Sequence, residues 1–235
     1  MLDLSILTAR LLNMLFLGLA IVSGLTVHEC AHAWAAYQRG DPTAKYLGRI
    51  SLNPLRHLDL IGGLMILVMI VAGVGFGWAR PVPVNPYNLR RGSRDYALIS
   101  FAGPLSNLAL GLVFALILRG LLLVFPLSAG GGNLIQLLLY TLLFTLAVVN
   151  WSLAVFNLLP IPPLDGFSVL LGILDSLPYH LRWARQLAFT LRQLEPYGVY
   201  LLIMVIVLGT LGGGGLLSRL FYLVWEIAAR VSGYA

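Results

Sequence analysis

The sequence predicts an all-α polytopic membrane protein with about five to six membrane helices. Of its 235 residues, 59% are hydrophobic and only 10% are charged, whereas a typical soluble domain carries about 25% charged residues. The mean hydropathy is +0.90, and the apolar residues form continuous runs close to the ~20 residues that one bilayer crossing needs. A transmembrane barrel would show short alternating segments instead.

The first apolar run covers residues 6–37 and is long enough to cross a bilayer. It ends at a clear stop signal, which consists of Arg39, Gly40, Asp41 and Pro42. No small-residue cleavage site follows the apolar stretch at 11–27, so we expect a retained helix and not a signal peptide.

The second apolar run, residues 60–77, is the least regular. It contains glycines, each of which weakens a helix by up to about 1 kcal/mol: Gly62, Gly63, Gly73, Gly75 and Gly77. We expect a re-entrant or shallow segment here. The flanking stretches 45–52 and 79–84 resemble short extended pieces that could pair as a small β-hairpin-like element, although Pro81 and Pro83 restrict the second to an edge.

Two long apolar runs follow, residues 96–125 and 134–159, separated by Pro126 and a glycine-rich turn. After a polar stretch, residues 197–211 are apolar, and a final helix to about Arg230 either spans the membrane or lies at its interface. No internal repeat or second domain is visible, so we expect residues 1–235 to form a single membrane-embedded domain.

The candidate chemistry begins with the pentad His28, Glu29, Cys30, Ala31 and His32 in the first apolar run. Residues four apart lie one turn apart on the same helix face, so both imidazoles can reach one metal ion at about 2.0–2.1 Å. Glu29 is offset by one position and can address a water bound there without being a ligand. Zinc hydrolases need this division of labour.

The alternative is a structural role, in which these side chains only link helices through buried hydrogen bonds. Each ionisable group inside a membrane costs up to about 3 kcal/mol to insert. Three such groups on adjacent turns therefore favour a common partner, and a divalent cation is the simplest one.

A catalytic zinc site takes three protein ligands and leaves one position for water, so a third ligand must come from elsewhere in the chain. Asp165 is the strongest candidate, because it ends a proline-rich stretch, residues 157–166, that breaks a membrane helix and presents one carboxylate. Its alternative role is helix capping. The other candidates lie in loop contexts that solvation explains more easily: His57, Asp59, Asp175 and His180.

With these motifs the chain resembles the site-2 protease family of intramembrane zinc metalloproteases, and in particular its compact prokaryotic members. The likeness extends over most of the chain and rests on the segments TVHECAH (26–32), GDPTA (40–44), GRISLNPLRHLD (48–59), GWARPVPVNP (77–86), AGPLSN (102–107) and NLLPIPPLDG (157–166). No PDZ-like insertion or nucleotide-sensing module is visible. The 27 residues before His28 leave no room for the additional span that many members carry there.

The resemblance implies that His28, His32 and Asp165 ligate one Zn²⁺ per chain and that Glu29 is the catalytic residue. It also implies that Asn157 orients the substrate or polarises its carbonyl, while an interhelical hydrogen bond is an equal alternative for this residue. We expect Gly103 and Asn107, four residues apart, to serve close helix packing and not substrate contact.

The metal ligands constrain the topology. His28 and His32 lie toward the end of the first span and Asp165 just follows the run 134–159, so a single crossing by 60–77 would put them toward opposite faces. Eleven of the 15 basic residues then fall on one side, in three groups: Arg39, Lys45, Arg49 and Arg56; Arg80, Arg90, Arg91 and Arg94; Arg182, Arg185 and Arg192. The positive-inside rule predicts a zinc site nearer the cytoplasmic face of the cell membrane.

These observations predict a protease that hydrolyses peptide bonds in or near transmembrane segments of other membrane proteins. The expected partners are such substrates and anionic lipid headgroups, which Arg90, Arg91 and Arg94 would contact, and not nucleic acid. The alternative is a non-hydrolytic metal-binding membrane transporter or chaperone. An inactive scaffold is disfavoured because Glu29 is present.

Overall fold

The computed structural model describes residues 4–72, 77–127, 133–178, 180–211 and 215–234, and the regular elements in these ranges are helices. By length and composition, four helical stretches could cross a membrane: Ser5–Gln38, Ser93–Val124, Leu134–Asn157 and Arg182–Gly209. The predicted all-α membrane fold is confirmed. Gly73, Gly75, the glycines at 130–132 and those at 212–214 lie outside the described residues.

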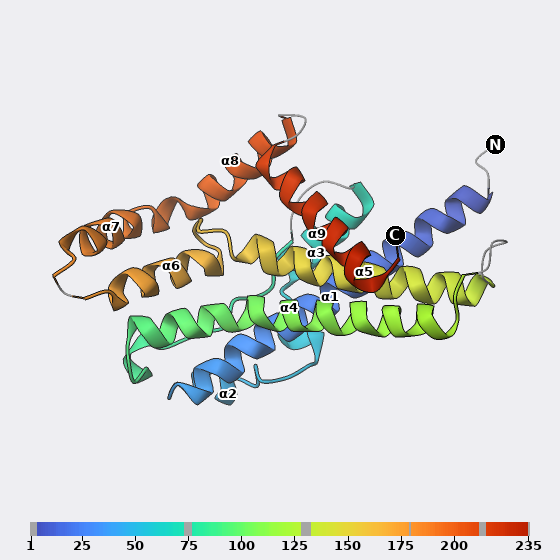
Figure 1. Ribbon diagram of the computed structural model, residues 1–235. Coiled ribbons are helices and arrows are strands. Elements are labelled where there is room, and N and C mark those ends of the chain that lie inside the picture. Colours follow the sequence, from blue (N-terminus) through green and yellow to red (C-terminus); the bar gives the residue numbers. More distant parts are fainter. Residues whose placement is uncertain (1–3, 73–76, 128–132, 179, 212–214, 235) are drawn as a thin grey trace.

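The centre of the molecule is built from three long helices, α1 (Leu4–Gln38), α4 (Ser93–Val124) and α5 (Leu134–Asn157). They lie side by side, and α4 and α5 run antiparallel along most of their length (Figure 1). Small residues allow the close approach: Ala115 and Ala147 are fully buried, and a Cβ at Gly111 would collide with the Trp151 indole. His28 and His32 of α1 face α4 at one of these close contacts.

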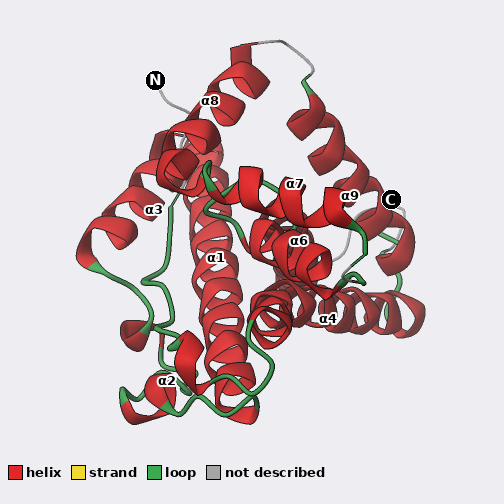
Figure 2. Ribbon diagram, turned by 90° about the vertical axis from the view of Figure 1, so that its left-hand side faces the viewer, coloured by secondary structure: helices red, strands yellow, loops and turns green. Residues whose placement is uncertain are grey.

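The irregular run 60–77 does not cross the bundle. Its helix α3 (Leu60–Ala72) has only 13 residues, or about 20 Å, against the ~30 Å of a bilayer core. The Arg80 N–H donates to the His57 carbonyl at 2.6 Å, so the chain enters and leaves this segment at one place. Figure 2 shows α3 beside α1, where Ile66 packs with Ile21 and Leu25. The described ends of the segment therefore lie together, as the predicted re-entrant or shallow segment requires.

The predicted β-hairpin-like element is wrong for the described residues, which contain no strand. The stretch 45–52 is turn-rich: it follows the short helix α2 (Thr43–Tyr46) and turns at Gly48, whose φ is +69°. A 3₁₀ turn, η1 (Pro54–Arg56), comes next. The stretch 79–84 stays irregular, since Pro81 and Pro83 have no N–H to donate to a ladder.

The polar stretch after α5 is helical, which the sequence did not predict. Helices α6 (Asp165–Ser176) and α7 (Arg182–Arg192) form a hairpin around a core of Phe167, Leu171, Leu174, Ala184 and Ala188. The 3₁₀ turns η2 (Pro86–Asn88) and η3 (Glu195–Tyr197) flank α4 and α8. Helices α8 (Gly198–Leu211) and α9 (Leu216–Ser232) complete the chain, and α9 packs against α4 and α5 through Val224 and Ala228.

Candidate metal centre

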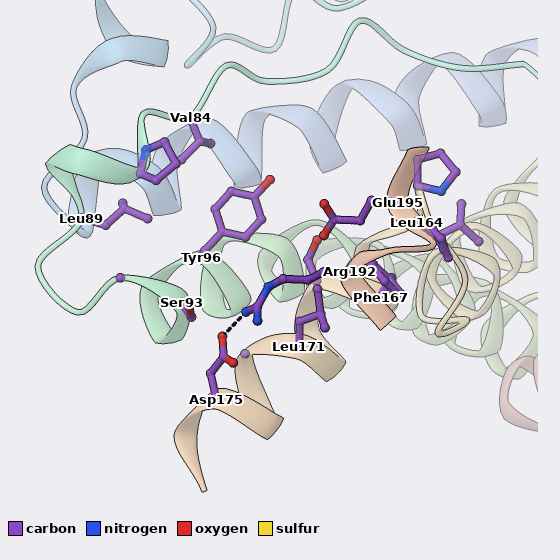
Figure 3. A pocket seen from close by; sticks show the side chains of 16 residues that line it. Val84, Leu89, Ser93, Tyr96, Leu164, Phe167, Leu171, Asp175, Arg192 and Glu195 are labelled. Carbon is purple, nitrogen blue, oxygen red and sulfur yellow. Dashed lines mark hydrogen bonds and ion pairs between the residues drawn. The ribbon is translucent and has the colours of Figure 1, made fainter. Parts of the chain in front are cut away.

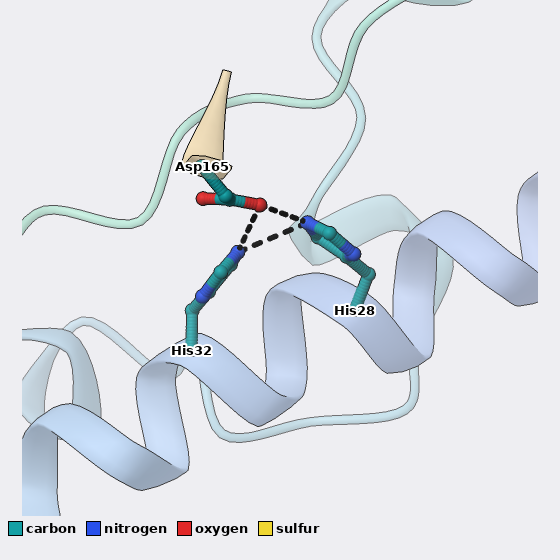
Figure 4. Close-up of side chains that lie close together, drawn as sticks. All are labelled: His28, His32 and Asp165. Atoms are coloured by element: carbon teal, nitrogen blue, oxygen red, sulfur yellow. Dashed lines mark hydrogen bonds and ion pairs between the residues drawn. The ribbon is translucent and has the colours of Figure 1, made fainter. Parts of the chain in front are cut away.

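Three side chains from two distant parts of the chain meet between α1 and the start of α6 (Figure 4). The Nε2 atoms of His28 and His32 lie 3.0 Å apart. One oxygen of Asp165, Oδ2, lies 3.0 Å from the first and 3.3 Å from the second. The two rings are buried and the carboxylate is mostly buried. The convergence predicted from the sequence is confirmed, although Asp165 is 133 positions beyond His32.

The opposite edge of each ring is held by a hydrogen bond from its Nδ1 atom. His28 Nδ1 lies 2.6 Å from Asn107 Oδ1, and His32 Nδ1 lies 2.7 Å from the Ile99 carbonyl oxygen. The Ile99 carbonyl oxygen can only accept a hydrogen bond, so His32 donates to it through Nδ1. The Asn107 amide oxygen is also an acceptor, so His28 donates to it through Nδ1 as well. In a neutral imidazole that donates through Nδ1, the Nε2 atom keeps a lone pair, and here both Nε2 atoms face Asp165.

Helix α4 supplies this support because it approaches α1 very closely at Gly103. A Cβ at that position would collide with both imidazole rings, which confirms the packing role predicted for this glycine. Asn107 does more than pack. Its amide nitrogen donates to the Gly24 carbonyl at 3.1 Å and to Asn150 Oδ1 at 2.8 Å, so a fully buried network holds the oxygen that binds His28.

Asp165 reaches the site because the chain turns sharply after α5. The Leu164 N–H donates to the Ile161 carbonyl at 2.9 Å, and α6 begins at Asp165 itself. The next residue, Gly166, packs so tightly that a Cβ there would meet the Leu158 backbone. Asp165 is thus in the first turn of α6, but its carboxylate faces the histidines.

The three donors fit a zinc ion. Tetrahedral zinc with bonds of about 2.0–2.1 Å places its ligand atoms about 3.3 Å apart, and the separations here are 3.0, 3.0 and 3.3 Å. Two neutral imidazoles with oriented Nδ1–H groups and one carboxylate are a common donor set of catalytic zinc. Within the described residues, this is the one group of at least three such side chains close enough to hold a metal ion.

Glu29 is buried beside the centre but outside the donor set. Arg49 approaches it, with 4.0 Å between the guanidinium Nη2 and Glu29 Oε2. Arg49 was expected among the charges of the cytoplasmic side, yet its side chain is only 6% exposed. Burial lowers the pKa of the Arg49 guanidinium, the Glu29 charge opposes this, and Arg80 adds to it. Nothing in the sequence indicated that Arg49 is buried, because a single arginine in a loop is usually solvated.

The other predicted side chains make hydrogen bonds to the backbone. The Asn157 amide donates to the Leu153 carbonyl of its own helix at 2.9 Å. His57 was expected to be solvated, but it is fully buried and its Nε2 lies 2.7 Å from the Ser51 carbonyl oxygen. Asp59 accepts from the Gly62 N–H at the start of α3. Neither His57 nor Asp59 belongs to the group of donor side chains.

A cavity of about 580 Å³ lies against the start of α6, although none of the three donor side chains is among the residues that line it. Figure 3 shows Leu164 and Phe167, which flank Asp165 in the sequence, on its wall. Val84 and Tyr96 line the cavity as well, and an ion pair between Arg192 and Asp175 lies at its polar side. The cavity thus reaches Leu164, the residue directly before Asp165.

Comparison with known proteins identifies the family to which this chain is similar. The model of peptidase family M50 matches residues 118–192, a range that includes Asp165. A Bacillus subtilis (strain 168) protein named "Putative zinc metalloprotease YwhC" is 39% identical over 83% of this chain and 82% of its own length. No solved structure matches the chain significantly.

Two mycobacterial proteins, both named Rip2 and described in the same words as YwhC, are more distant. The protein of Mycolicibacterium smegmatis is 32% identical over 69% of this chain, and that of Mycobacterium tuberculosis (strain H37Rv) is 33% identical over 78%. The alignments span 60% and 62% of those relatives' lengths. With the extent of the YwhC match, these likenesses lead to one conclusion: the chain belongs to peptidase family M50, the site-2 protease family, and is an intramembrane zinc metalloprotease.

Proposed function

We propose that this protease cuts other membrane proteins in or near a transmembrane segment, with His28, His32 and Asp165 as the ligands of its zinc ion. The observation that carries the proposal is the meeting of two oriented imidazoles and one carboxylate in the buried part of a membrane protein. Glu29 lies one position from His28 on the same helix and is the general base of the proposed reaction. The alternative, a non-hydrolytic transporter or chaperone, would not need Glu29 outside the donor set.

The reaction that these residues support is hydrolysis of a peptide bond. Zinc supplies Lewis-acid chemistry, which polarises a carbonyl and makes water nucleophilic near neutral pH. Glu29 takes a proton from the attacking water and later passes it to the nitrogen of the leaving amine. The buried surroundings exclude bulk water and strengthen the electrostatic interactions in the site.

The substrate must be extended at the bond that is cut, because a helix hides that carbonyl in its hydrogen-bond ladder. The stretch 79–84 is a candidate partner: the backbone N–H and C=O groups of Val82 and Val84 have no hydrogen-bond partner among the described residues. An extended chain paired there would continue along the cavity that Val84 lines. Asn157, at the end of α5, remains our candidate for orienting the substrate.

We also propose a multi-pass orientation in the cell membrane with the zinc site nearer the cytoplasmic face and the start of α1 outside. Arg39, Arg90 and Arg91 are at the end of the bundle where α1 finishes and α4 begins, which is the expected cytoplasmic side. The exposed Arg90 and Arg91 side chains are proposed contacts for anionic headgroups. Nucleic acid is not an expected partner, and the oligomeric state stays open.

Cysteine labelling tests this orientation. After replacement of Cys30, a cysteine at Gly131 should react with a membrane-impermeant maleimide added to intact cells, and a cysteine at Arg91 should react only after permeabilisation. The reverse pattern would contradict the proposed orientation.

Reconstitution tests the proposed activity. The purified protein in detergent is mixed with a panel of single-span reporter proteins, in parallel with Glu29→Gln and with wild type plus a zinc chelator. We expect product from wild type alone, with zinc retained by Glu29→Gln. Equal product in all three samples would point to a contaminating peptidase, and Glu29→Gln as active as wild type would contradict the role of Glu29.

A further inference from the structure

Arg49 is a buried cation beside the reacting groups, and neither the ligand set nor the general base accounts for it. It is 5% exposed, and its Nη2 atom lies 4.0 Å from Glu29 Oε2. That separation is an ion pair but not a hydrogen bond. The same nitrogen donates to the Arg80 carbonyl. Among the described residues, Arg49 Nε has no hydrogen-bond partner.

An unpaired donor on a buried guanidinium needs a physical reason. Burying a charge is costly unless its hydrogen-bonding groups are satisfied, and native proteins leave few buried polar atoms without a partner. If Arg49 only linked Glu29 to Arg80 structurally, all N–H groups of its guanidinium would be expected to have hydrogen-bond partners. The incomplete pairing fits a group whose remaining partner arrives with the substrate.

The position of Arg49 is fixed before any substrate binds. Its backbone N–H donates to the Ala44 carbonyl at 2.9 Å, and its side chain is anchored by the Arg80 carbonyl. Arg80 in turn donates to His57 and directly precedes the stretch 81–84, the candidate partner of an extended substrate. Arg49 therefore lies between the proposed general base and the proposed path of the substrate.

We propose that Arg49 is a catalytic residue that binds the carbonyl oxygen of the peptide bond being cut. This inference rests on the proposed function. As the water oxygen bonds to the carbonyl carbon, Glu29 takes the water proton and the C=O electron pair moves onto the oxygen, next to the guanidinium charge. When the carbonyl re-forms, the C–N bond breaks and the proton goes to the departing nitrogen. A fixed donor at a developing oxyanion acts mainly on the transition state.

Two substitutions separate this role from a structural tie. Arg49→Lys keeps the charge, whereas Arg49→Gln removes the charge but keeps an N–H donor for the Arg80 carbonyl. Arg56→Gln is the matched control, since Arg56 is an exposed arginine of the same loop. The readouts are kcat and KM on a single-span reporter that wild type cleaves, together with zinc content and the midpoint of thermal unfolding in detergent.

We expect kcat to fall about 100-fold or more in Arg49→Gln, while KM changes less than about threefold and zinc content and unfolding midpoint stay at wild-type values. Arg49→Lys should keep a kcat about tenfold above that of Arg49→Gln, and Arg56→Gln should match wild type.

The inference is overturned if Arg49→Gln is as active as Arg49→Lys, if only KM changes, or if activity falls in step with zinc content or stability. If Arg49→Gln does not fold, the inference is overturned as well, because the side chain is then a structural tie. Failure of the proposed function differs from all of these, because Glu29→Gln would then cleave the reporter as well as wild type.

Discussion

Asn107 and the Ile99 carbonyl determine which nitrogen of each histidine faces Asp165. Without a hydrogen bond at Nδ1, either ring could rotate or present its protonated nitrogen to the metal. The support matters as much as the ligands, since loss of such a partner typically costs 10–100-fold in metal affinity. The centre is thus a five-residue arrangement built on α1, α4 and α6.

This arrangement predicts the effect of Asn107→Leu. The substitution removes the acceptor of His28 Nδ1, so we expect zinc affinity to fall about 10–100-fold, measured by competition with a chromophoric chelator. Ser106→Ala is the control, because the Ser106 hydroxyl donates to the Gly103 carbonyl of its own helix and not to either histidine. Unchanged affinity in Asn107→Leu would show that its hydrogen bond does not orient the ring.

At the scale of single residues, the sequence predicted that His28, His32 and Asp165 come together, because their chemistry is unusual in and beside apolar runs. His28, Glu29 and His32 share a spacing that only a helix turns into one site, and Asp165 follows a helix-breaking proline stretch. Asn107 was interpreted as packing and Arg49 as a surface charge. Their actual positions depend on contacts 79 residues apart in the first case and on burial of a loop in the second, and no local pattern encodes either.

At the level of the elements, the segment that contains α3 depends on close contact between its two ends, near Gly62 and Gly77. A Cβ at Gly62 would collide with the Trp78 carbonyl, and one at Gly77 would meet Ile66. Gly63, next in sequence to Gly62, has no atom within 4 Å of its ideal Cβ position. Close packing thus explains Gly62 and Gly77, whereas the sequence alone indicated only that glycines weaken a helix here.

Gly62→Ala and Gly63→Ala should therefore have opposite effects. We expect Gly62→Ala to lower the free energy of unfolding by about 1–3 kcal/mol through overpacking. Gly63→Ala should raise it by up to about 1 kcal/mol, since alanine favours a helix interior. Denaturant unfolding in detergent measures both. A Gly62→Ala protein as stable as Gly63→Ala would contradict this close packing.

A buried carboxylate joins the end of α1 to the loop before α4. Asp41 is fully buried and accepts from the Thr43 N–H and hydroxyl, the Asn85 N–H and the Asn88 amide, at 2.6–3.1 Å. Burial alone would raise the pKa of the Asp41 carboxyl, but the hydrogen bonds outweigh it and hold the pKa below its usual value of 3.8. These hydrogen bonds stabilise the ionised form of the Asp41 carboxylate.

A lowered pKa in the folded state means that the stabilisation is complete above the unfolded pKa and is lost as pH falls through the folded one. Asp41→Asn should therefore cost about 1–3 kcal/mol near neutral pH. Its difference from wild type should shrink once the pH falls below about 3.8. Urea unfolding in detergent, from neutral pH to below about 3.8, measures this difference in unfolding free energy. Glu195→Gln is the control, because Glu195 is exposed. A difference that does not depend on pH would contradict the account.

The sequence did not predict helices α6 and α7, which lie in the polar stretch after α5. Long apolar runs became α1, α4 and α5 with ends within three residues of those predicted, because burial in lipid leaves them no alternative. Helices α6 and α7 are short and amphipathic, and their apolar side chains are buried only when the two helices pack against each other and α6 packs on α4. The extended interpretation of 45–52 failed because Gly48 turns the chain there.

For the whole molecule, the position of the ligands decides the topology. Helices α1 and α5 both end at the metal side, and α4 begins there, so the segment between α1 and α4 has to return to the side it came from. The hydrogen bond between His57 and Arg80 closes that return. The sequence predicted this arrangement from the ligands alone, because a metal site tolerates only one depth.

The central claim is that His28, His32 and Asp165 hold one zinc ion, and metal analysis of purified protein tests it most directly. We predict one zinc per chain in wild type and Glu29→Gln, and loss of zinc in Asp165→Ala and His28→Ala proteins that keep their helical circular dichroism. Asp165→Ala with a full complement of zinc bound as tightly as in wild type would contradict the account.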